Sequence, residues 1–260
     1  MKNVKVLSAL LVAFGLVAAA CGGGGGSSVG SYELVAEDTL TVCTDSPYPP
    51  MEFEDENGNY TGFDIELMRE IADELGLEAS IVNIGFDPIT SGLAMESGEC
   101  DIAAASITIN ASREENIDFS NGYFSGDQSL LAKVDSGITS LADLSGKNLG
   151  VQSGTTGADY AEANNPGATI VGFENPGDLI TALNAGEVDA VLQDIVVNGD
   201  AALNNDDLTL IETYSTDEFY GFAVQEEGAE DLLTEVNDAL QKIRDSGRYQ
   251  EIYDEFFPTS

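Results

Sequence analysis

Hydrophobic positions along the chain alternate between two spacings, and this alternation predicts an α/β fold. Short continuous apolar runs are typical of strands buried on both faces, and apolar residues three and four positions apart are typical of amphipathic helices. In the first half, these patterns predict strands at residues 40–44, 78–84 and 101–107 and helices at residues 64–75 and 87–98. Asp87 and Pro88 form a favourable start for the second helix.

The second half repeats the same alternation after a link near residues 125–128. The patterns there predict strands at residues 149–152, 169–173, 190–193 and 219–224 and helices at residues 158–164, 176–185 and 229–256. Repeated strand–helix cycles favour mostly parallel sheets flanked by helices. The two similar cycles predict two lobes, and we expect the late segments to return to the first lobe because a trailing helix pair forms no core alone.

Arg113 lies where a predicted helix begins, which is an unfavourable place for a positive charge. Ser112 and Glu115 have the spacing of a capping box, and the helix would follow them. A cation in the first turn opposes the helix dipole at a cost of up to about 1 kcal/mol. We therefore expect an anion opposite Arg113, such as a ligand carboxylate. The alternative is a solvated arginine that pairs with Glu114 or Glu115.

A second candidate anion site lies in the turn at residues 153–157, Ser-Gly-Thr-Thr-Gly, between a predicted strand and a predicted helix. Backbone N–H groups at a helix N-terminus have no acceptor within the helix and readily bind anions. The turn lacks the lysine and the spacing of a nucleotide phosphate loop. A simple tight turn is the alternative interpretation.

Further candidates follow predicted strands. Asp45 and Asp194 come at the carboxyl ends of two strands, where open α/β sheets bind ligands, and each can accept an ammonium group. Tyr48, in a proline-rich segment, and Phe86 can supply aromatic walls, although a lone phenylalanine is more often part of a core. Two anion sites, two carboxylates and two aromatic rings together match a zwitterionic ligand.

The N-terminus has the features of an export signal. Lys2 and Lys5 precede an apolar stretch and three alanines, so residues 1–20 are predicted to be a signal peptide. Cys21 and the Gly/Ser-rich residues after it resemble the lipobox and tether of bacterial lipoproteins, which predicts lipidation at Cys21 and a tether over residues 21–36. A signal peptide with an unmodified cysteine is the alternative.

Composition narrows the function further. The chain has 47 acidic and 9 basic residues, a formal net charge of −38, and such a surface repels nucleic acid and anionic lipid. The absence of histidine excludes histidine-based triads and metal sites, and no cofactor is indicated. Cys43 and Cys100 can form a disulfide after export or be buried separately.

The chain resembles the amino-acid-binding family of periplasmic solute-binding proteins that serve ABC importers. The resemblance extends over residues 40–257 and rests on segments 44–50, 62–65, 100–113, 117–120, 150–156, 189–194 and 244–249. It implies a type II fold with two hinged lobes, in which crossings near residues 125–128 and 217–220 allow closure on the ligand. We predict that residues 37–125 and 220–260 form lobe 1 and residues 126–219 form lobe 2.

The resemblance also implies individual roles. Arg113 would bind the ligand α-carboxylate in a bidentate pair with help from backbone N–H groups of Thr108 and Thr156, and Asp194 would accept the α-ammonium. Asp45 would meet the polar end of the ligand side chain. The predicted ligand-binding set comprises Asp45, Tyr48, Phe86, Ser106, Thr108, Arg113, Gln152, Thr155, Thr156 and Asp194.

Together these features predict a monomeric, lipid-anchored, non-catalytic receptor on the outer face of the cytoplasmic membrane. It would capture glutamine, a basic residue or another polar L-amino acid and deliver it to the permease of an ABC importer. One alternative is an enzyme on the same scaffold that resembles cyclohexadienyl dehydratase, with Asp45, Glu52 or Asp194 as the general acid. Another alternative is the ligand-binding component of a sensor.

Overall fold

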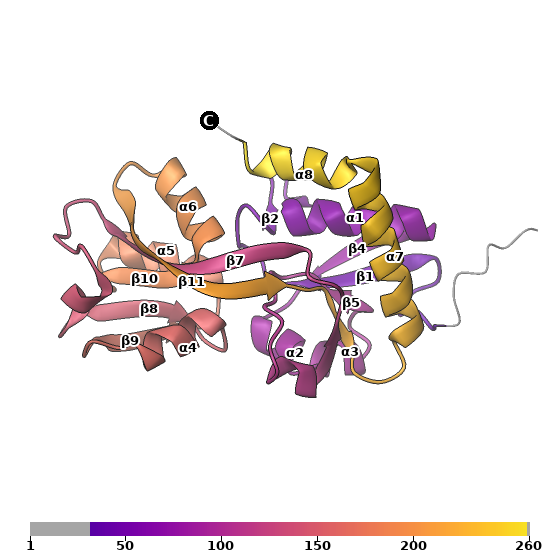
Figure 1. The fold of residues 1–260 in the computed structure, drawn as a ribbon, viewed down its shortest axis with the longest axis horizontal. Helices are drawn as coiled ribbons and strands as arrows, with labels where there is room; N and C mark the ends of the chain where they lie inside the picture. Colours follow the sequence, from indigo (N-terminus) through magenta and orange to yellow (C-terminus); the bar gives the residue numbers. More distant parts are fainter. Residues whose placement is uncertain (1–31, 259–260) are drawn as a thin grey trace, which may run out of the picture.

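The computed structural model describes residues 32–258, which form two lobes, each built on a five-stranded sheet (Figure 1). The strands of the first sheet are β1 (Thr39–Thr44), β4 (Glu78–Asn83), β5 (Ile102–Ala103), β6 (Ile117–Phe119) and β12 (Ala223–Gln225). Those of the second sheet are β7 (Phe124–Lys133), β8 (Asn148–Gln152), β9 (Thr169–Phe173), β10 (Ala190–Asp194) and β11 (Leu208–Tyr220). A short hairpin of β2 (Phe53–Glu54) and β3 (Tyr60–Thr61) lies outside both sheets.

The two sheets share one topology. Their strand orders are β4-β1-β5-β12-β6 and, from the matching edge, β9-β8-β10-β7-β11. In each sheet one strand, β12 or β7, runs antiparallel to the other four. The predicted α/β class with two mostly parallel sheets is therefore confirmed, and the repeated cycle in the sequence corresponds to a repeated sheet.

Helices cover both faces of each sheet. The first lobe contains α1 (Phe63–Leu75), α2 (Phe86–Thr90), α3 (Leu93–Glu96), α7 (Glu230–Ser246) and α8 (Arg248–Phe256). The second lobe contains α4 (Thr156–Ala163), α5 (Pro176–Ala185) and α6 (Ile195–Asn204), and two short 3-10 helices are η1 (Arg113–Glu115) and η2 (Leu141–Leu144). In Figure 1, α1, α7 and α8 lie on one side of the first sheet and α2 and α3 lie on the other.

Strand periodicity divides each lobe into two cores. In β1, Val42 packs with α1 and α7, whereas the next residue, Cys43, packs with α2 and α3. In β7, Leu130 and Leu131 face different cores in the same way. Consecutive side chains of a strand point to opposite faces, so a continuous apolar run is what a sheet covered on both faces requires.

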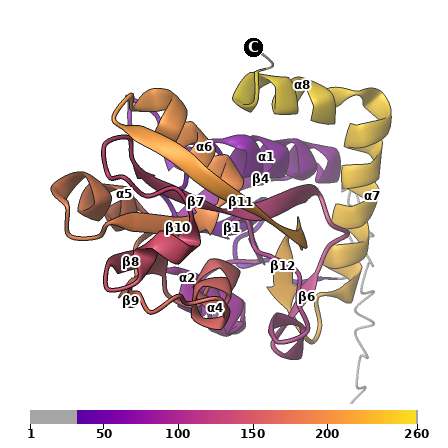
Figure 2. The ribbon, with the colours of Figure 1, turned by 60° about the vertical axis from the view of Figure 1, so that its left-hand side comes forward.

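Two long strands cross between the lobes. β7 and β11 pair as an antiparallel ribbon, and both views show them side by side (Figures 1 and 2). The segment at residues 125–128, expected as a link, lies inside β7, and residues 217–220 lie at the end of β11. After β11 the chain returns to the first sheet with β12, α7 and α8.

Cys43 and Cys100 form a disulfide, which settles the two open alternatives for these residues. Cys43 lies in β1, and Cys100 lies two residues before β5, the neighbouring strand. Both cysteines are buried in the core beneath α2 and α3. The bond therefore ties adjacent strands of the first sheet beside the site described below.

Several predicted elements are wrong in extent. The predicted strand at 101–107 is only β5, because the chain leaves the sheet after Ala103 and Ser106 adopts a left-handed conformation with φ 47°. The predicted helix at 87–98 is α2 and α3, which are separated at Gly92. Gly92 has φ 79°, and a Cβ there would lie 2.6 Å from the carbonyl oxygen of Asn116. Glycine is thus required where the helix is interrupted.

The elements near the C-terminus also differ from those predicted. Helical periodicity over residues 229–256 predicted one helix, but the structure has two, α7 and α8. Gly247 adopts a left-handed conformation between them and ends α7. The predicted strand at 219–224 is divided between β11 and β12. Helix α6 and most of β7 and β11 were not predicted.

The predicted signal peptide, Cys21 and most of the predicted tether lie outside the described residues. The last part of the tether, residues 32–36, contacts the first lobe: the Tyr32 hydroxyl donates to Glu235 at 2.8 Å and the Val35 N–H donates to Asp101 at 2.7 Å. Within residues 32–258, no helix has both the length and the apolar character needed to cross a membrane.

Candidate functional site

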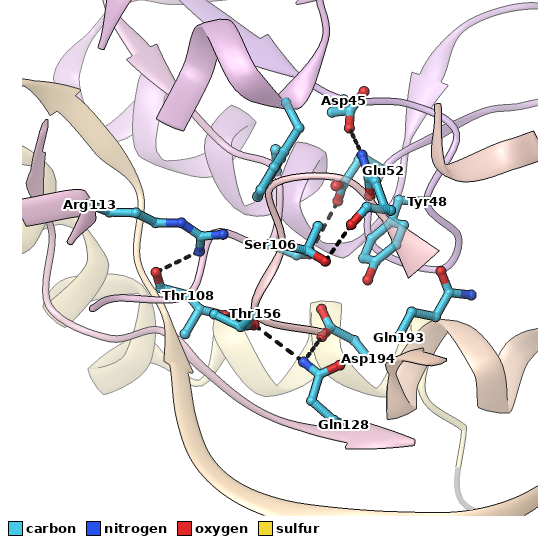
Figure 3. Close-up of a pocket in the computed structure, with 14 residues that line it drawn as sticks. Asp45, Tyr48, Glu52, Ser106, Thr108, Arg113, Gln128, Thr156, Gln193 and Asp194 are labelled. Atoms are coloured by element: carbon cyan, nitrogen blue, oxygen red, sulfur yellow. Dashed lines mark hydrogen bonds between the residues drawn. The ribbon is translucent and has the colours of Figure 1, made fainter. Parts of the chain in front are cut away.

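A pocket lies between the two lobes, and residues of both lobes line it (Figure 3). The first lobe contributes Asp45, Tyr48, Glu52, Phe86, Ala105, Ser106, Thr108 and Arg113. The second contributes Gln128, Gln152, Thr155, Thr156, Gln193 and Asp194. All ten residues of the predicted ligand-binding set line this one pocket, although they come from positions up to 149 residues apart along the chain.

The loop after β5 is held in an unusual conformation at the pocket. Ser106 has φ 47°, a region that non-glycine residues rarely adopt, and its backbone N–H donates to Asp64 at 2.9 Å. Asp64 lies in the first turn of α1, is fully buried and also accepts a bond of 2.6 Å from the Tyr123 hydroxyl. This buried carboxyl group thus holds Ser106 in its strained backbone conformation. The loop in this conformation places Ser106 and Thr108 at the pocket.

Arg113 does not begin an α-helix, so the predicted capping box is wrong. Its segment is the three-residue 3-10 helix η1, and the Ser112 side chain makes no capping hydrogen bond. So short a helix has no appreciable macrodipole, and the dipole argument does not apply. The surface alternative is wrong as well, because Arg113 is only 7% exposed.

The guanidinium of Arg113 instead connects the lobes. It donates to the carbonyl oxygen of Thr108 at 2.8 Å and to that of Gly154, in the second lobe, at 3.2 Å. Its Cζ atom lies 5.0 Å from the centroid of the Phe86 ring, a cation–π contact. Burial lowers the pKa of Arg113, and the charges of Asp194 and Glu218 act in the opposite sense. A guanidinium remains ionised under such conditions, so the pocket contains a permanent buried cation.

The second lobe presents a helix N-terminus to the pocket. Thr155 is the N-cap of α4, and its hydroxyl accepts from the Ala158 N–H at 3.1 Å. The same hydroxyl donates to the carbonyl oxygen of Gln152 at 2.8 Å, which fixes the turn relative to the end of β8. Thr156 opens the helix, and the first N–H groups of a helix have no intrahelical acceptor. The turn therefore offers donors at the pocket.

Asp194 ends β10 and is buried, and its ionised form carries the charge opposite to that of Arg113. The Gln128 amide donates to it at 2.5 Å, and the Tyr48 side chain lies beside it (Figure 3). Burial raises the pKa of Asp194 to about 6, while these donors favour the ionised form. A positively charged group in the pocket would stabilise the carboxylate.

Two further carboxyl groups line the pocket. Asp45 accepts a bond of 2.6 Å from the Gln152 amide, and burial raises its pKa to about 6. Glu52 is only 1% exposed, and burial together with the nearby charges of Asp64, Asp45 and Asp194 raises its pKa well above the usual range. Asp45, Glu52 and Asp194 thus line the pocket beside a single guanidinium, and a positively charged ligand group would stabilise the ionised forms of Asp45 and Asp194.

Four lining residues were absent from the predicted set: Glu52, Ala105, Gln128 and Gln193. The sequence named Glu52 only as a candidate acid of the enzyme alternative, and its burial depends on packing. Gln193 is a polar residue that directly follows the apolar strand sequence Ala190–Leu192, a signal that could have identified it, whereas Gln128 lies between Asp127 and Ser129 and has no such signal. Within residues 32–258, no group of three or more acidic or cysteine side chains is arranged to hold a metal ion.

Comparison with known proteins is consistent with this geometry. Residues 40–259 match the bacterial extracellular solute-binding proteins, family 3. The L-cystine-binding protein TcyJ of Escherichia coli is 32% identical over 223 residues, which cover 84% of this chain and 82% of TcyJ. The ABC transporter glutamine-binding protein GlnH of Bacillus subtilis is 35% identical over 202 residues, or 76% of this chain and 72% of GlnH.

A solved structure of an ancestral arginine-binding protein bound to arginine has the same fold. It superimposes with a TM-score of 0.78 at 36% sequence identity and covers 85% of this chain and 98% of the ancestral protein. Residues 40–259, which the family model matches, include the crossing strands and every residue that lines the pocket. The chain therefore belongs to the bacterial extracellular solute-binding proteins, family 3.

Proposed function

We propose that this protein captures a polar L-amino acid between its two lobes and delivers it to the permease of an ABC importer. The observation that carries the proposal is the pair Arg113 and Asp194, opposite charges buried in one pocket. Arg113 binds the α-carboxylate, together with backbone N–H groups of Thr108 and Thr156, and Asp194 accepts the α-ammonium. Tyr48 and Phe86 enclose the ligand side chain.

The side chain of the ligand lies toward Asp45. The Gln152 amide already donates to this carboxylate, so the ligand group that replaces or joins it is itself a hydrogen-bond donor. Glutamine and the basic amino acids meet this condition. The relatives named for glutamine and arginine support the same range, and an ionised Asp45 would favour a basic side chain.

The protein acts outside the cytoplasm as a monomer tethered through a lipid on Cys21. The export signal and the lipobox-like segment of the sequence support this part of the proposal. The two crossing strands, β7 and β11, serve as the hinge between lobe 1 (residues 37–125 and 220–260) and lobe 2 (residues 126–219). Fatty-acid labelling in a bacterial host tests the anchor: Cys21→Ser should abolish incorporation, and retained label would contradict it.

Calorimetry with matched ligands tests the binding site. L-Arginine and L-glutamine should bind, whereas agmatine, which is arginine without its carboxylate, should bind at least about 100-fold more weakly because Arg113 then lacks its partner. A ligand at 100 times its dissociation constant should stabilise the fold by about 2.7 kcal/mol. Equal binding of agmatine and arginine would contradict the carboxylate assignment.

The dehydratase-like alternative requires turnover as well as binding. A cyclic amino-acid precursor that loses water on aromatisation is the appropriate probe, because Asp45, Glu52 and Asp194 are the acids available in the pocket. We expect no loss of water above the uncatalysed rate. Measurable turnover that disappears in Glu52→Gln would instead favour an enzyme.

A further inference from the structure

The Glu218 side chain accepts three hydrogen bonds at a single carboxylate oxygen. Its Oε2 atom accepts from the Thr108 hydroxyl at 3.0 Å, from the Thr156 hydroxyl at 2.9 Å and from the Gln128 amide at 3.2 Å. Hydrogen bonds to a charged acceptor are stronger than neutral ones. One half-buried carboxylate therefore organises three side chains that line the pocket.

The three donors belong to different parts of the molecule. Thr108 lies on the first lobe, Thr156 opens α4 on the second lobe, and Gln128 lies on the crossing strand β7. The two threonine hydroxyls lie 3.5 Å apart. Any opening of the lobes that separates them must break at least one of their bonds to Glu218.

Glu218 is also connected to both charged ends of the pocket. Its negative charge acts on Arg113, and its donor Gln128 uses the same amide nitrogen to bind Asp194 at 2.5 Å. Glu218 itself is not among the residues that line the pocket. It can therefore influence a ligand only through the residues that it holds.

The crossing strand is irregular where it presents this side chain. The pairing of β11 with β7 shifts register between Tyr214 and Glu218, and Asp217 has φ 56°, a left-handed conformation. The irregular segment is held by a bond of 3.0 Å from the Thr216 N–H to Asp127 on β7. Bulges of this kind redirect side chains near functional sites, and here Glu218 reaches both lobes.

We propose that Glu218 is a positioning residue that acts as a closure latch between the lobes. It stabilises the closed arrangement even without ligand, because the hydroxyls of Thr108 and Thr156 reach its carboxylate together only when the lobes meet. A ligand that requires the closed state then binds more tightly, since part of the cost of closure is already met. The effect on ligand affinity rests on the proposed function, whereas the effect on closure does not.

Three variants separate the latch from general effects of charge. Glu218→Ala removes the acceptor, and Glu218→Gln keeps an oxygen acceptor while removing the charge. Glu212→Ala is the matched control, because Glu212 lies on the same strand but, among residues 32–258, accepts only from the Leu141 N–H at 2.7 Å and the Tyr214 hydroxyl at 2.9 Å, both in the second lobe. It loses the same charge without disconnecting the lobes.

Small-angle X-ray scattering of the ligand-free protein tests the latch directly. Glu218→Ala should have a larger radius of gyration than the wild type, whereas Glu218→Gln and Glu212→Ala should keep the wild-type value. Circular dichroism confirms that each variant is folded. An unchanged radius of gyration in Glu218→Ala, or an equal expansion in Glu212→Ala, would overturn the proposal.

Titration with L-arginine and L-glutamine supplies a second readout. Glu218→Ala should weaken both ligands by the same factor, roughly tenfold, because the lost interactions do not touch the ligand side chain. Unchanged affinity, or a loss for one ligand only, would contradict a latch. If the wild type binds neither ligand nor any other amino acid, the proposed function fails, while the scattering comparison still decides whether Glu218 holds the lobes together.

Discussion

The side-chain amide of Gln152 donates a hydrogen bond of 2.6 Å to the carboxylate of Asp45, and this bond joins the two lobes. Gln152 ends β8 in the second sheet, and Asp45 directly follows β1 in the first. Both side chains are buried in the pocket. Asp45 therefore has a neutral partner in Gln152, and a cationic ligand group would be a stronger one.

Replacing Asp45 with Asn should change ligand selectivity more than stability. The variant keeps the size of the side chain and removes its charge, so arginine should bind at least about tenfold more weakly while glutamine is nearly unaffected. Calorimetry with both amino acids measures the ratio. An equal loss of affinity for the two ligands would mean that Asp45 does not face the ligand side chain.

Removing the Arg113 guanidinium should abolish most amino-acid binding. Arg113→Ala leaves a buried ligand carboxylate without its partner, at an expected cost of about 2–5 kcal/mol in binding free energy. Arg113→Lys should recover only part of this affinity, because an ammonium cannot form the bidentate pair. Arg248→Ala, which removes a surface arginine paired with Glu70, is the control and should bind normally. Near-normal binding by Arg113→Ala would refute the site assignment.

The ligand-free protein should become less stable as the pH rises. Burial raises the pKa of Asp45 and Asp194 from 3.8 to about 6 and that of Asp64 to about 7. A carboxyl group with a raised folded-state pKa contributes stability below its unfolded pKa, and this contribution is lost as the pH rises through the folded value. Urea unfolding should therefore give a larger free energy at about pH 5 than at about pH 8.

Ligand affinity should depend on pH in the opposite direction. An α-ammonium group pairs with ionised Asp194, so the affinity for arginine should fall as the pH drops below about 6, the pKa of this carboxyl group. Calorimetry in buffers with different ionisation enthalpies would detect the accompanying proton release. In Asp194→Asn the residual binding should lose this component of the pH dependence. An affinity that is constant from about pH 8 to about pH 5 would show that Asp194 need not ionise for binding.

Loss of the disulfide should destabilise the first lobe. The bond closes a loop with a sequence separation of 57 residues, for which the chain-entropy estimate of stabilisation is about 4 kcal/mol. The double variant Cys43→Ala/Cys100→Ala should unfold at a correspondingly lower urea concentration. Dithiothreitol should destabilise the wild type and leave the double variant unchanged, and a comparable effect on both would point to a cause other than this bond.

Added salt should stabilise the fold. The formal net charge of −38 generates repulsion that is screened at high ionic strength, where the Debye length falls to about 3 Å at 1 M salt. The melting temperature should therefore rise between about 0.1 M and about 1 M sodium chloride. Sucrose at equal osmolality distinguishes screening from general exclusion effects, and a melting temperature that responds equally to both would contradict screening.

The elements that the sequence predicted well are those whose patterns are local. Helix α1 has a complete apolar face and ends at Gly76, and β9 and α5 have the predicted bounds. The helix at 87–98 was predicted too long because Gly92 adopts a left-handed conformation close to the carbonyl oxygen of Asn116, a residue distant in sequence. Local periodicity carries no information about such contacts.

The pocket-lining residues were predictable because most of them follow strands or begin a helix. Asp45 and Asp194 occupy strand ends, and Thr155 and Thr156 begin α4, so the topology alone brings them to one edge of each sheet. The reason given for Arg113 was wrong, since its segment is too short to have a helix dipole. Arg113 nevertheless lines the pocket, and the resemblance to the family had named it without the dipole argument.

The sequence by itself determined the strand–helix order, the two-lobe class and ten residues of the pocket, because these follow from spacing and from segments that match a family. Only the tertiary structure decided which groups meet across the lobes: Gln152 with Asp45, Arg113 with Gly154, and Glu218 with two threonines and Gln128. Burial, and with it the raised pKa of Glu52, was likewise decided there. Hydrogen bonds and desolvation depend on distances between segments remote in the chain, and no local pattern encodes those distances.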